Sequence, residues 1–358
     1  MKTKPLGALL LILLLAACKR NVADTRLTTA VAANGRPVLA ALASVYQNPV
    51  IPASQDPKDP QVFKATDGKF YLVHPNDNKY KIYSSSDLVN WTLKTAAGFT
   101  KSTGSFWSAG SFKSGSTYNL YYTHVLGAKN KRIGVATSST PDGPYTDANA
   151  SLVVKTDASG GYIPVIDPSV FKDPANGKVY LYYARNVGTG TLPDLRCVEL
   201  TADGLNTVAG TDKQVLTITQ DWEKINIEHP LVYYAPNAQP SHRYYMLYNG
   251  AGGALPRYAI GYAYAASPAG PFTKAVAGTA TGNNPLVAQD PSKGIYGPGA
   301  PNTVVDDAGE RWLIYRIKTT NTEAWNDRAI CIDVLFRNGS DQLICTPTKG
   351  TNQTAPTF

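Results

Sequence analysis

The stretch Asp167-Pro168-Ser169-Val170-Phe171, followed by Gly177-Lys178-Val179-Tyr180-Leu181, decides the fold because its pattern returns along the chain. The pattern is a small or acidic residue, commonly a proline, two or three apolar residues, a glycine turn and an aromatic run. Related copies stand about 60 residues apart, beginning at Asp59, Trp107, Glu228 and Gly299. A period of that size, built from short strands and turns, is typical of a β-propeller, whose blades bury their faces only against one another. The sequence therefore predicts an all-β fold, a five-bladed β-propeller.

The composition agrees with this prediction and excludes other classes. The 358 residues are 43% hydrophobic and 17% charged, which permits a large core. The 22 Tyr against 2 Met indicate β-structure, since aromatic residues suit half-buried pleated positions. The net charge of +8 is spread without a run of Lys and Arg among aromatics, so nucleic acid is not expected as a partner.

The N-terminus has the pattern of a targeting segment. Lys2 and Lys4 precede an apolar run from Leu6 to Leu15 that is too short for a comfortable membrane span. The following Ala16-Ala17-Cys18 resembles the lipobox of bacterial lipoproteins, which implies cleavage before Cys18 and its lipidation. An ordinary secretory signal with a chance cysteine is the alternative.

We accordingly expect a signal peptide over 1–17, a tether over 18–45 and the propeller as catalytic domain over 46–358. Lys19 supplies no acidic retention residue, which favours a lipid anchor in the outer membrane of a bacterial cell envelope, on its periplasmic or surface face. Through that lipid, the membrane is a predicted partner.

The remaining cysteines leave one question open. Cys331 and Cys345 flank the hairpin signal Asn338-Gly339, and export permits a disulfide between them. The pattern does not decide whether they are bridged. Cys197 lies in an apolar, strand-like stretch and is predicted to be a small core residue.

Three acids occupy the start of repeat copies, and equivalent positions of a propeller converge on its axis. We therefore expect Asp59, Asp167 and Glu228 to meet around one central pocket. Asp before Pro also commonly starts a turn, so a purely structural role stays possible for each. Asp56 is a near rival to Asp59, but the spacing from Asp59 to Gly68 better matches that from Asp167 to Gly177.

The chain resembles glycoside hydrolase family 43 and related five-bladed β-propeller glycosidases over roughly residues 46 to 350. The resemblance rests on six motifs in order: Asp59-Pro60, Ser86-Asp87-Leu88 with Trp91, Trp107-Ser108-Ala109, Asp167-Pro168-Ser169-Val170-Phe171, Glu228 with Pro230, and Gly297-Pro298-Gly299. It implies that Asp59 is the general base, Glu228 the general acid, and Asp167 the residue that tunes and holds the acid.

The chemistry of glycoside hydrolysis is consistent with that division. Inversion needs two carboxyl groups roughly 6.5–9.5 Å apart, so that a water fits between one of them and the sugar. A third carboxylate beside the acid keeps it protonated through like-charge repulsion. No metal ligand or cofactor is expected for this reaction.

Three residues depart from the family pattern. Ala300 stands where many members carry a His that helps hold an axial ion or water, so a central calcium is doubtful. Arg316 stands where a His is common, and its guanidinium is expected to bind sugar hydroxyls or a catalytic acid. His229 follows Glu228 where small residues are usual, and it is expected either to pack beneath the pocket or to contact substrate.

Sugar binding generally uses an aromatic face beneath the ring. Phe106, Trp107, Trp222 and Tyr296 are the candidates in the repeat register, with core packing as the alternative for each. The other histidines, His74, His124 and His242, have no metal-ligand spacing and are read as structural.

The sequence thus predicts an exported, lipid-anchored, inverting glycosidase that degrades poly- or oligosaccharides. Arabinose-, xylose- and galactose-containing glycans are the candidate substrates. Two alternatives remain: a related five-bladed family acting on algal oligosaccharides or fructans, and a catalytically inactive propeller that binds glycans. The fructan-acting type usually opens with Asn-Asp-Pro-Asn, which is absent from the chain.

Overall fold

The computed structural model describes residues 27–31, 37–41, 44–186, 191–276 and 284–358. The chain divides into two units, Met1–Val45 and Tyr46–Phe358. In the first unit, β1 (Leu27–Val31) pairs antiparallel with β2 (Pro37–Ala41). The predicted signal peptide and Cys18 lie outside the described residues. Within the described residues, the structure has no helix with the length and apolar character needed to span a membrane.

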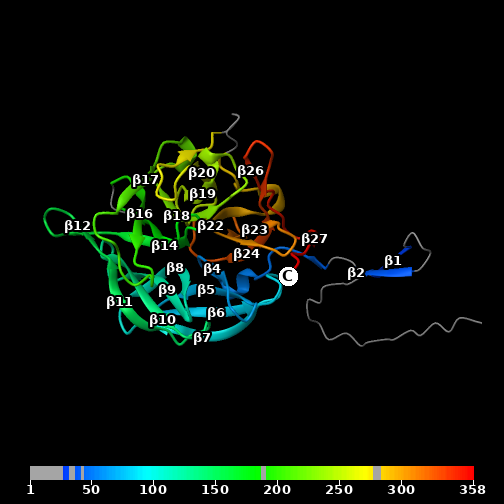
Figure 1. The fold of residues 1–358 in the computed structure, drawn as a ribbon, viewed down its shortest axis with the longest axis horizontal. Coiled ribbons are helices and arrows are strands. Elements are labelled where there is room, and N and C mark those ends of the chain that lie inside the picture. The colour runs from blue at the N-terminus through cyan, green and yellow to red at the C-terminus, as the bar shows by residue number, and fades with distance from the viewer. Residues whose placement is uncertain (1–26, 32–36, 42–43, 187–190, 277–283) are drawn as a thin grey trace, which may run out of the picture. The chain divides into compact units, whose positions relative to one another are not determined.

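Across the described part of the second unit, five antiparallel sheets surround a common centre as the blades of a propeller (Figure 1). The first blade contains β4 (Gln61–Lys64), β5 (Phe70–Asn76), β6 (Lys79–Ser85) and β7 (Thr92–Thr100). The second contains β8 (Ser105–Ser114), β9 (Thr117–Val125), β10 (Lys131–Ser138) and β11 (Thr146–Val153). The third contains β14 (Val165–Lys172), β15 (Val179–Arg185), β16 (Asp194–Leu200) and β17 (Lys213–Thr217).

The fourth blade contains β18 (Ile227–Tyr234), β19 (Tyr244–Gly250), β20 (Ala259–Ala265) and β21 (Thr273–Lys274). The fifth contains β22 (Tyr296–Val305), β23 (Arg311–Lys318) and β24 (Arg328–Val334). Short strands come before, between or after the blades in the sequence: β3 (Val45–Tyr46), β12 (Lys155–Thr156), β13 (Tyr162–Ile163), β25 (Phe336–Arg337), β26 (Leu343–Ile344) and β27 (Gln353–Thr354). Single 3₁₀ turns cover Ala53–Gln55, Asp221–Glu223, Pro240–His242 and Pro291–Lys293.

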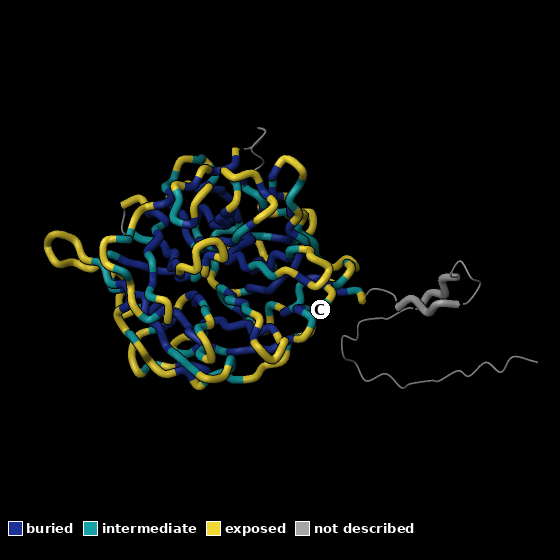
Figure 2. Tube along the Cα trace, viewed as in Figure 1, coloured by how far each residue is buried: buried dark blue, intermediate teal, exposed yellow. Residues whose placement is uncertain are grey.

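The aromatic runs of the repeat form the second strand of each blade, and both of their faces are buried. In β5, Tyr71 and Val73 pack toward the second blade, whereas Phe70 and Leu72 pack toward the fifth. Because successive side chains of a strand point to opposite faces, such a run serves two blade interfaces at once. Figure 2 shows the result as a buried interior with exposure concentrated on the outer edges and turns.

The ring is closed by residues from the start of the second unit. Ile51 bridges Ile330 at the outer edge of the three-stranded fifth blade. The side chain of Asn48 donates to the Ile332 carbonyl over 2.7 Å and accepts from the Ile332 N–H over 2.9 Å. Tyr46 donates its hydroxyl to the same carbonyl over 2.7 Å. The N-terminal segment therefore supplies the edge contacts that a fourth strand would make.

The inner strands share one irregularity that aims side chains at the axis. In four blades the residue before a proline has a left-handed backbone: Asp59 (φ 26°), Asp167 (φ 58°), His229 (φ 53°) and Ala300 (φ 51°). In the third and fourth blades a register shift surrounds that residue. Such a bulge re-aims the side chains beside it.

This register corrects one sequence-based expectation. Glu228 was expected at the position equivalent to Asp167, but Asp167 corresponds to His229. Glu228 still belongs to the ladder, opposite Asn249, as Ile166 does opposite Ala184. The repeat pattern was aligned on its acids, whereas the backbone aligns on the pre-proline residue.

Cys197, Cys331 and Cys345 are buried and free. The hairpin predicted at Asn338-Gly339 is present, because β25 pairs with β26 around it. That register places Phe336 opposite Ile344, so Cys331, which lies earlier in β24, is not the cross-strand partner of Cys345. The bridge that the sequence left open is not formed.

Candidate active site

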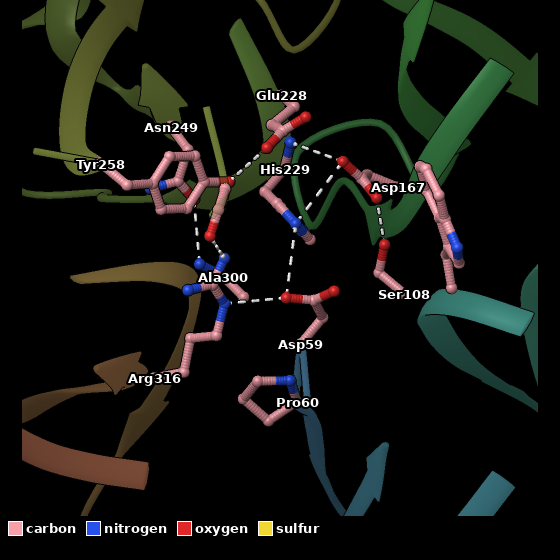
Figure 3. A network of polar contacts seen from close by, with 12 residues as sticks. Asp59, Pro60, Ser108, Asp167, Glu228, His229, Asn249, Tyr258, Ala300 and Arg316 are labelled. Atoms are coloured by element: carbon pink, nitrogen blue, oxygen red, sulfur yellow. Dashed lines mark hydrogen bonds and ion pairs between the residues drawn. The ribbon is translucent and has the colours of Figure 1, made fainter. Parts of the chain in front are cut away.

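A cavity of about 320 Å³ lies where the blades meet, and all five blades contribute to its wall. Its lining includes the three predicted acids Asp59, Asp167 and Glu228. Figure 3 shows these carboxyl groups around the His229 imidazole, with Asp59 and Glu228 on opposite sides of it in this view. The fold thus gathers residues that lie up to 169 positions apart in the sequence, as expected from convergence on the axis.

Asp59, just before β4, is surrounded by positive charge. Its Oδ1 accepts a hydrogen bond from Nε of Arg316 over 2.8 Å and lies 3.6 Å from Nη1 of Arg328. His229 Nε2 is 3.9 Å from the same oxygen. Burial alone would raise the pKa of Asp59, but Arg328, Arg316 and His229 together hold that pKa well below its ordinary value. Asp59 is therefore ionised across the working range of most enzymes.

Asp167, on β14, has the opposite electrostatic character. It is 4% exposed, and burial followed by the negative charge of Glu228 raises its pKa to about 6, against the lowering effects of His229 and Ser108. Ser108 donates its hydroxyl to Oδ1, and the His229 backbone N–H lies 3.3 Å from Oδ2. Its own backbone N–H donates to Thr123. Asp167 is thus fixed in place and gains a proton readily.

Glu228, at the start of β18, is 7% exposed and held by one strong contact. The hydroxyl of Tyr258 donates to its Oε1 over 2.7 Å. Tyr258 is fully buried, and the Arg316 guanidinium lies 4.8 Å from the centre of its ring. Gly253 closes the site tightly, since a Cβ there would lie 3.4 Å from Oε1 of Glu228 and 3.2 Å from Nη2 of Arg316.

The residues on the axis do not fit a metal ion. Ala300 brings only a methyl group, and its backbone N–H donates to the Asn249 side chain over 2.9 Å. Among the described residues, no group of three or more His, Cys, Asp and Glu side chains is arranged to hold a metal. The donor set therefore disagrees with an axial calcium.

The aromatic candidates divide into two groups. Phe106 and Trp107 line the cavity, Trp107 being 36% exposed with the Lys131 ammonium 4.9 Å from its ring centre. Trp222 and Tyr296 do not line it. Trp222 instead packs in the fourth blade against Gly250 and Gly261, where it would clash with any Cβ, and donates to Gln220.

Several lining residues carried no repeat signal. Arg328 is 2% exposed and has two nitrogens, Nε and Nη2, without a protein partner. Trp325 is 61% exposed, with the Arg328 guanidinium 5.2 Å from its ring centre. The rest of the wall is formed by Lys58, Pro75, Asp77, Ser105, Ile166 and Gly253. The sequence offered one signal for Arg328: a charged residue at the start of the apolar segment that forms β24. Asp56, the rival to Asp59, does not line the cavity.

Comparison with known proteins agrees with this geometry. The model of glycosyl hydrolases family 43 matches residues 46–336. A curated relative, the beta-D-galactofuranosidase xynD of Aspergillus niger, is 23% identical over 324 residues, which cover 83% of this chain and 84% of the relative.

Solved structures extend the likeness to the whole propeller. A thermostable family-43 glycoside hydrolase is 28% identical with a TM-score of 0.74, covering 87% of this chain and 99% of its own. The alpha-L-arabinofuranosidase of Lactobacillus brevis is 16% identical with a TM-score of 0.70, covering 86% of this chain and 98% of its own, and this likeness bears on the fold alone. The chain is a member of glycosyl hydrolase family 43, a glycosidase on a five-bladed β-propeller.

Proposed function

We propose that the protein hydrolyses glycosidic bonds with inversion, using Asp59 as general base, Glu228 as general acid and Asp167 as the group that tunes and holds the acid. One observation carries the proposal: three carboxyl groups in one cavity have sharply different surroundings. Carboxyl groups whose environments push their protonation apart are the usual sign of divided acid and base roles.

The surroundings of Asp59 favour the role of base. Its pKa is held low by Arg328, Arg316 and His229 against the effect of burial, so the carboxylate is ready to accept a hydrogen bond from water. Arg316 fixes its orientation through Oδ1. In the proposed step, Asp59 takes a proton from water as the water oxygen bonds to the anomeric carbon.

The surroundings of Asp167 place a carboxyl group with a raised pKa beside Glu228, the proposed acid. The two carboxyl groups repel when both are charged, and the pKa of Asp167 rises to about 6 through burial and the neighbouring Glu228. Tyr258 holds Oε1 of Glu228 in place. In the proposed step, Glu228 gives its proton to the departing glycosidic oxygen as that bond breaks.

Cavity size and the named activities of relatives guide the choice of substrate. A volume of about 320 Å³ lies near the lower end for ligand pockets, which favours a short stretch of glycan. Trp107 and Trp325 offer exposed aromatic side chains for sugar rings in the wall of the same cavity. We propose arabinose-, xylose- or galactose-containing poly- or oligosaccharides as substrates.

Export and anchoring complete the proposal. Residues 1–17 would be removed and Cys18 lipidated, which would attach the enzyme to the outer membrane of a bacterial envelope. The catalytic chemistry proposed above uses carboxyl groups alone and calls for no cofactor.

The test is hydrolysis by the wild type, Asp59→Asn and Glu228→Gln on 4-nitrophenyl α-L-arabinofuranoside, β-D-xyloside and β-D-galactofuranoside, and on the corresponding polysaccharides. We expect turnover by the wild type on at least one substrate. Each variant should lose on the order of 10³-fold or more in kcat/KM, while its melting temperature stays close to that of the wild type. Glycan binding without turnover by the wild type would favour the inactive propeller instead.

A further inference from the structure

We propose that His229 is a positioning residue whose imidazole bridges Asp59 and Asp167 across the propeller axis. The inference rests on the proposed function for the roles of those two acids. It assigns to His229 neither substrate contact nor passive packing, the two roles expected from the sequence.

The imidazole lies between the two carboxyl groups. Nε2 is 3.6 Å from Oδ2 of Asp167 and 3.9 Å from Oδ1 of Asp59, within ion-pair distance of both (Figure 3). The backbone N–H of the same residue also points to Oδ2 of Asp167, at 3.3 Å. One residue of the fourth blade thus contacts a group from the first blade and a group from the third.

The charges around the imidazole are of both signs. Asp59 precedes β4, Asp167 belongs to β14, and Glu228 precedes His229 on β18. Arg316 of β23 and Arg328 of β24 lie beyond Asp59, on the oxygen they share with His229. The nearby imidazole lowers the pKa of Asp59 and of Asp167. Loss of the ring should therefore raise both pKa values.

The backbone of His229 shares the left-handed conformation of three other pre-proline residues. His229 has φ 53°, a left-handed conformation that is unfavourable for a residue with a Cβ and that glycine adopts readily. The same conformation occurs at Asp59, Asp167 and Ala300, so it belongs to the shared irregularity of the inner strands, a bulge that here re-aims the residue toward the axis. Glycine would suit this backbone better but would leave Asp59 and Asp167 unconnected.

Ala300, the pre-proline residue of the fifth blade, lies near His229. His229, Asp167 and Ala300 line one small cavity of about 20 Å³ beneath the active-site pocket. The equivalent pre-proline positions in three other blades hold Asp59, Asp167 and Ala300, and none of these residues carries an imidazole.

The experiment compares His229→Gly and His229→Gln with the wild type, and with His242→Gln as a matched control. His242 is the same residue type stacked on Tyr264, away from the cavity. The measurements are kcat and KM over a pH series, thermal unfolding, and rescue of the glycine variant by added imidazole.

We expect His229→Gly to lose roughly 10- to 100-fold in kcat with little change in KM, because Asp59 loses part of its orientation. The fall in its kcat on the acidic side of the pH series should occur at a higher pH than in the wild type. Added imidazole should restore part of the rate, and the Tm should stay level or rise. His229→Gln should shift the acid limb in the same direction, and His242→Gln should match the wild type.

A wild-type rate and pH profile in His229→Gly would overturn the inference, as would a wild-type profile in His229→Gln. The glycine variant keeps the test decisive should the glutamine variant fold poorly, because glycine relieves the backbone. Failure of the proposed function is separate: it would appear as a wild type without turnover, or as an active Asp59→Asn variant.

Discussion

Nε of Arg316 donates a hydrogen bond to Oδ1 of Asp59 over 2.8 Å, joining the fifth blade to the first at the floor of the pocket. Arg316 is 1% exposed, and its other nitrogens reach the Gly297 carbonyl at 3.3 Å and the Gly253 carbonyl at 3.2 Å. Three fixed acceptors leave the guanidinium a single orientation. The direction of the Asp59 carboxylate is therefore set by a side chain from the far end of the chain.

Arg316→Gln should impair catalysis through Asp59. Without the guanidinium, the pKa of Asp59 rises, since one of the positive charges that offset burial is gone. A general base must be ionised to act. As pH is lowered, the variant should therefore lose activity at a higher pH than the wild type does. We expect a drop on the order of 100-fold in kcat/KM, measured across a pH series. The exposed Arg243→Gln is the control, and an unshifted acid limb in Arg316→Gln would contradict the assignment.

Tyr258→Phe removes the hydroxyl that donates to Glu228 and leaves the ring in place. One lost hydrogen bond to a catalytic group should cost about 1.4 kcal/mol, or about ten-fold in kcat. The loss should be larger for substrates with poor leaving groups, which need protonation, than for dinitrophenyl glycosides. Tyr264→Phe, in the blade core, serves as control. Equal losses on both kinds of substrate would argue against Glu228 as the acid.

Gly253→Ala should disturb the pocket without unfolding the propeller. The added methyl would sit 3.2 Å from Nη2 of Arg316 and 3.4 Å from both Oε1 of Glu228 and Cζ3 of Trp325. Those neighbours must yield by a few tenths of an ångström, so kcat/KM should fall by roughly ten-fold while Tm changes little. In Gly252→Ala the methyl meets only the end of the Leu255 side chain, so that variant should retain activity.

The ring closure contains a titrating group. Asp333 accepts hydrogen bonds from Tyr315, Thr348 and Asn48, and burial raises its pKa to about 6 despite the bonds from Thr348 and Tyr315. A folded-state pKa above the unfolded value favours the protonated native state. Its stabilising contribution is full below about pH 4 and is lost as pH rises through about 6.

Asp333→Asn cannot titrate, so its stability relative to the wild type should improve between pH 4 and pH 7. The improvement should be at most about 3 kcal/mol, from a shift of about two pKa units. Denaturant unfolding at the two pH values measures it. Parallel pH dependence of the two proteins would show that Asp333 does not titrate in this range.

The fold could be predicted because each blade is stable only when it packs against its neighbours. Every blade therefore needs an apolar strand of the same kind, and this pattern recurs along the sequence. The aromatic runs that became β5, β9, β15, β19 and β23 must be apolar on both faces, which makes them visible without any alignment. The three-stranded fifth blade was less visible, because Ile51 and Asn48 complete its edge from the other end of the chain.

The site was predicted less fully, for two physical reasons. Arg328 and Trp325 line the pocket, and Tyr258 contacts Glu228, from segments outside the repeat phrase, where no pattern marks a residue that points to the axis. Trp222 and Tyr296 do not line the cavity, and the sequence could not show this, because a propeller uses aromatic residues in its core as readily as beneath a sugar. The bulge in β18 was also invisible, and it determines that His229, rather than Glu228, corresponds to Asp167.

Proton NMR of the first sugar released tests the central claim most directly, because the division of labour between Asp59 and Glu228 fixes the stereochemistry of the product. With Asp59 as base for an attacking water, the anomer that appears first should have the configuration opposite to that of the substrate, and mutarotation should follow. A first product with retained configuration would contradict the account, since it would require a covalent intermediate on the enzyme.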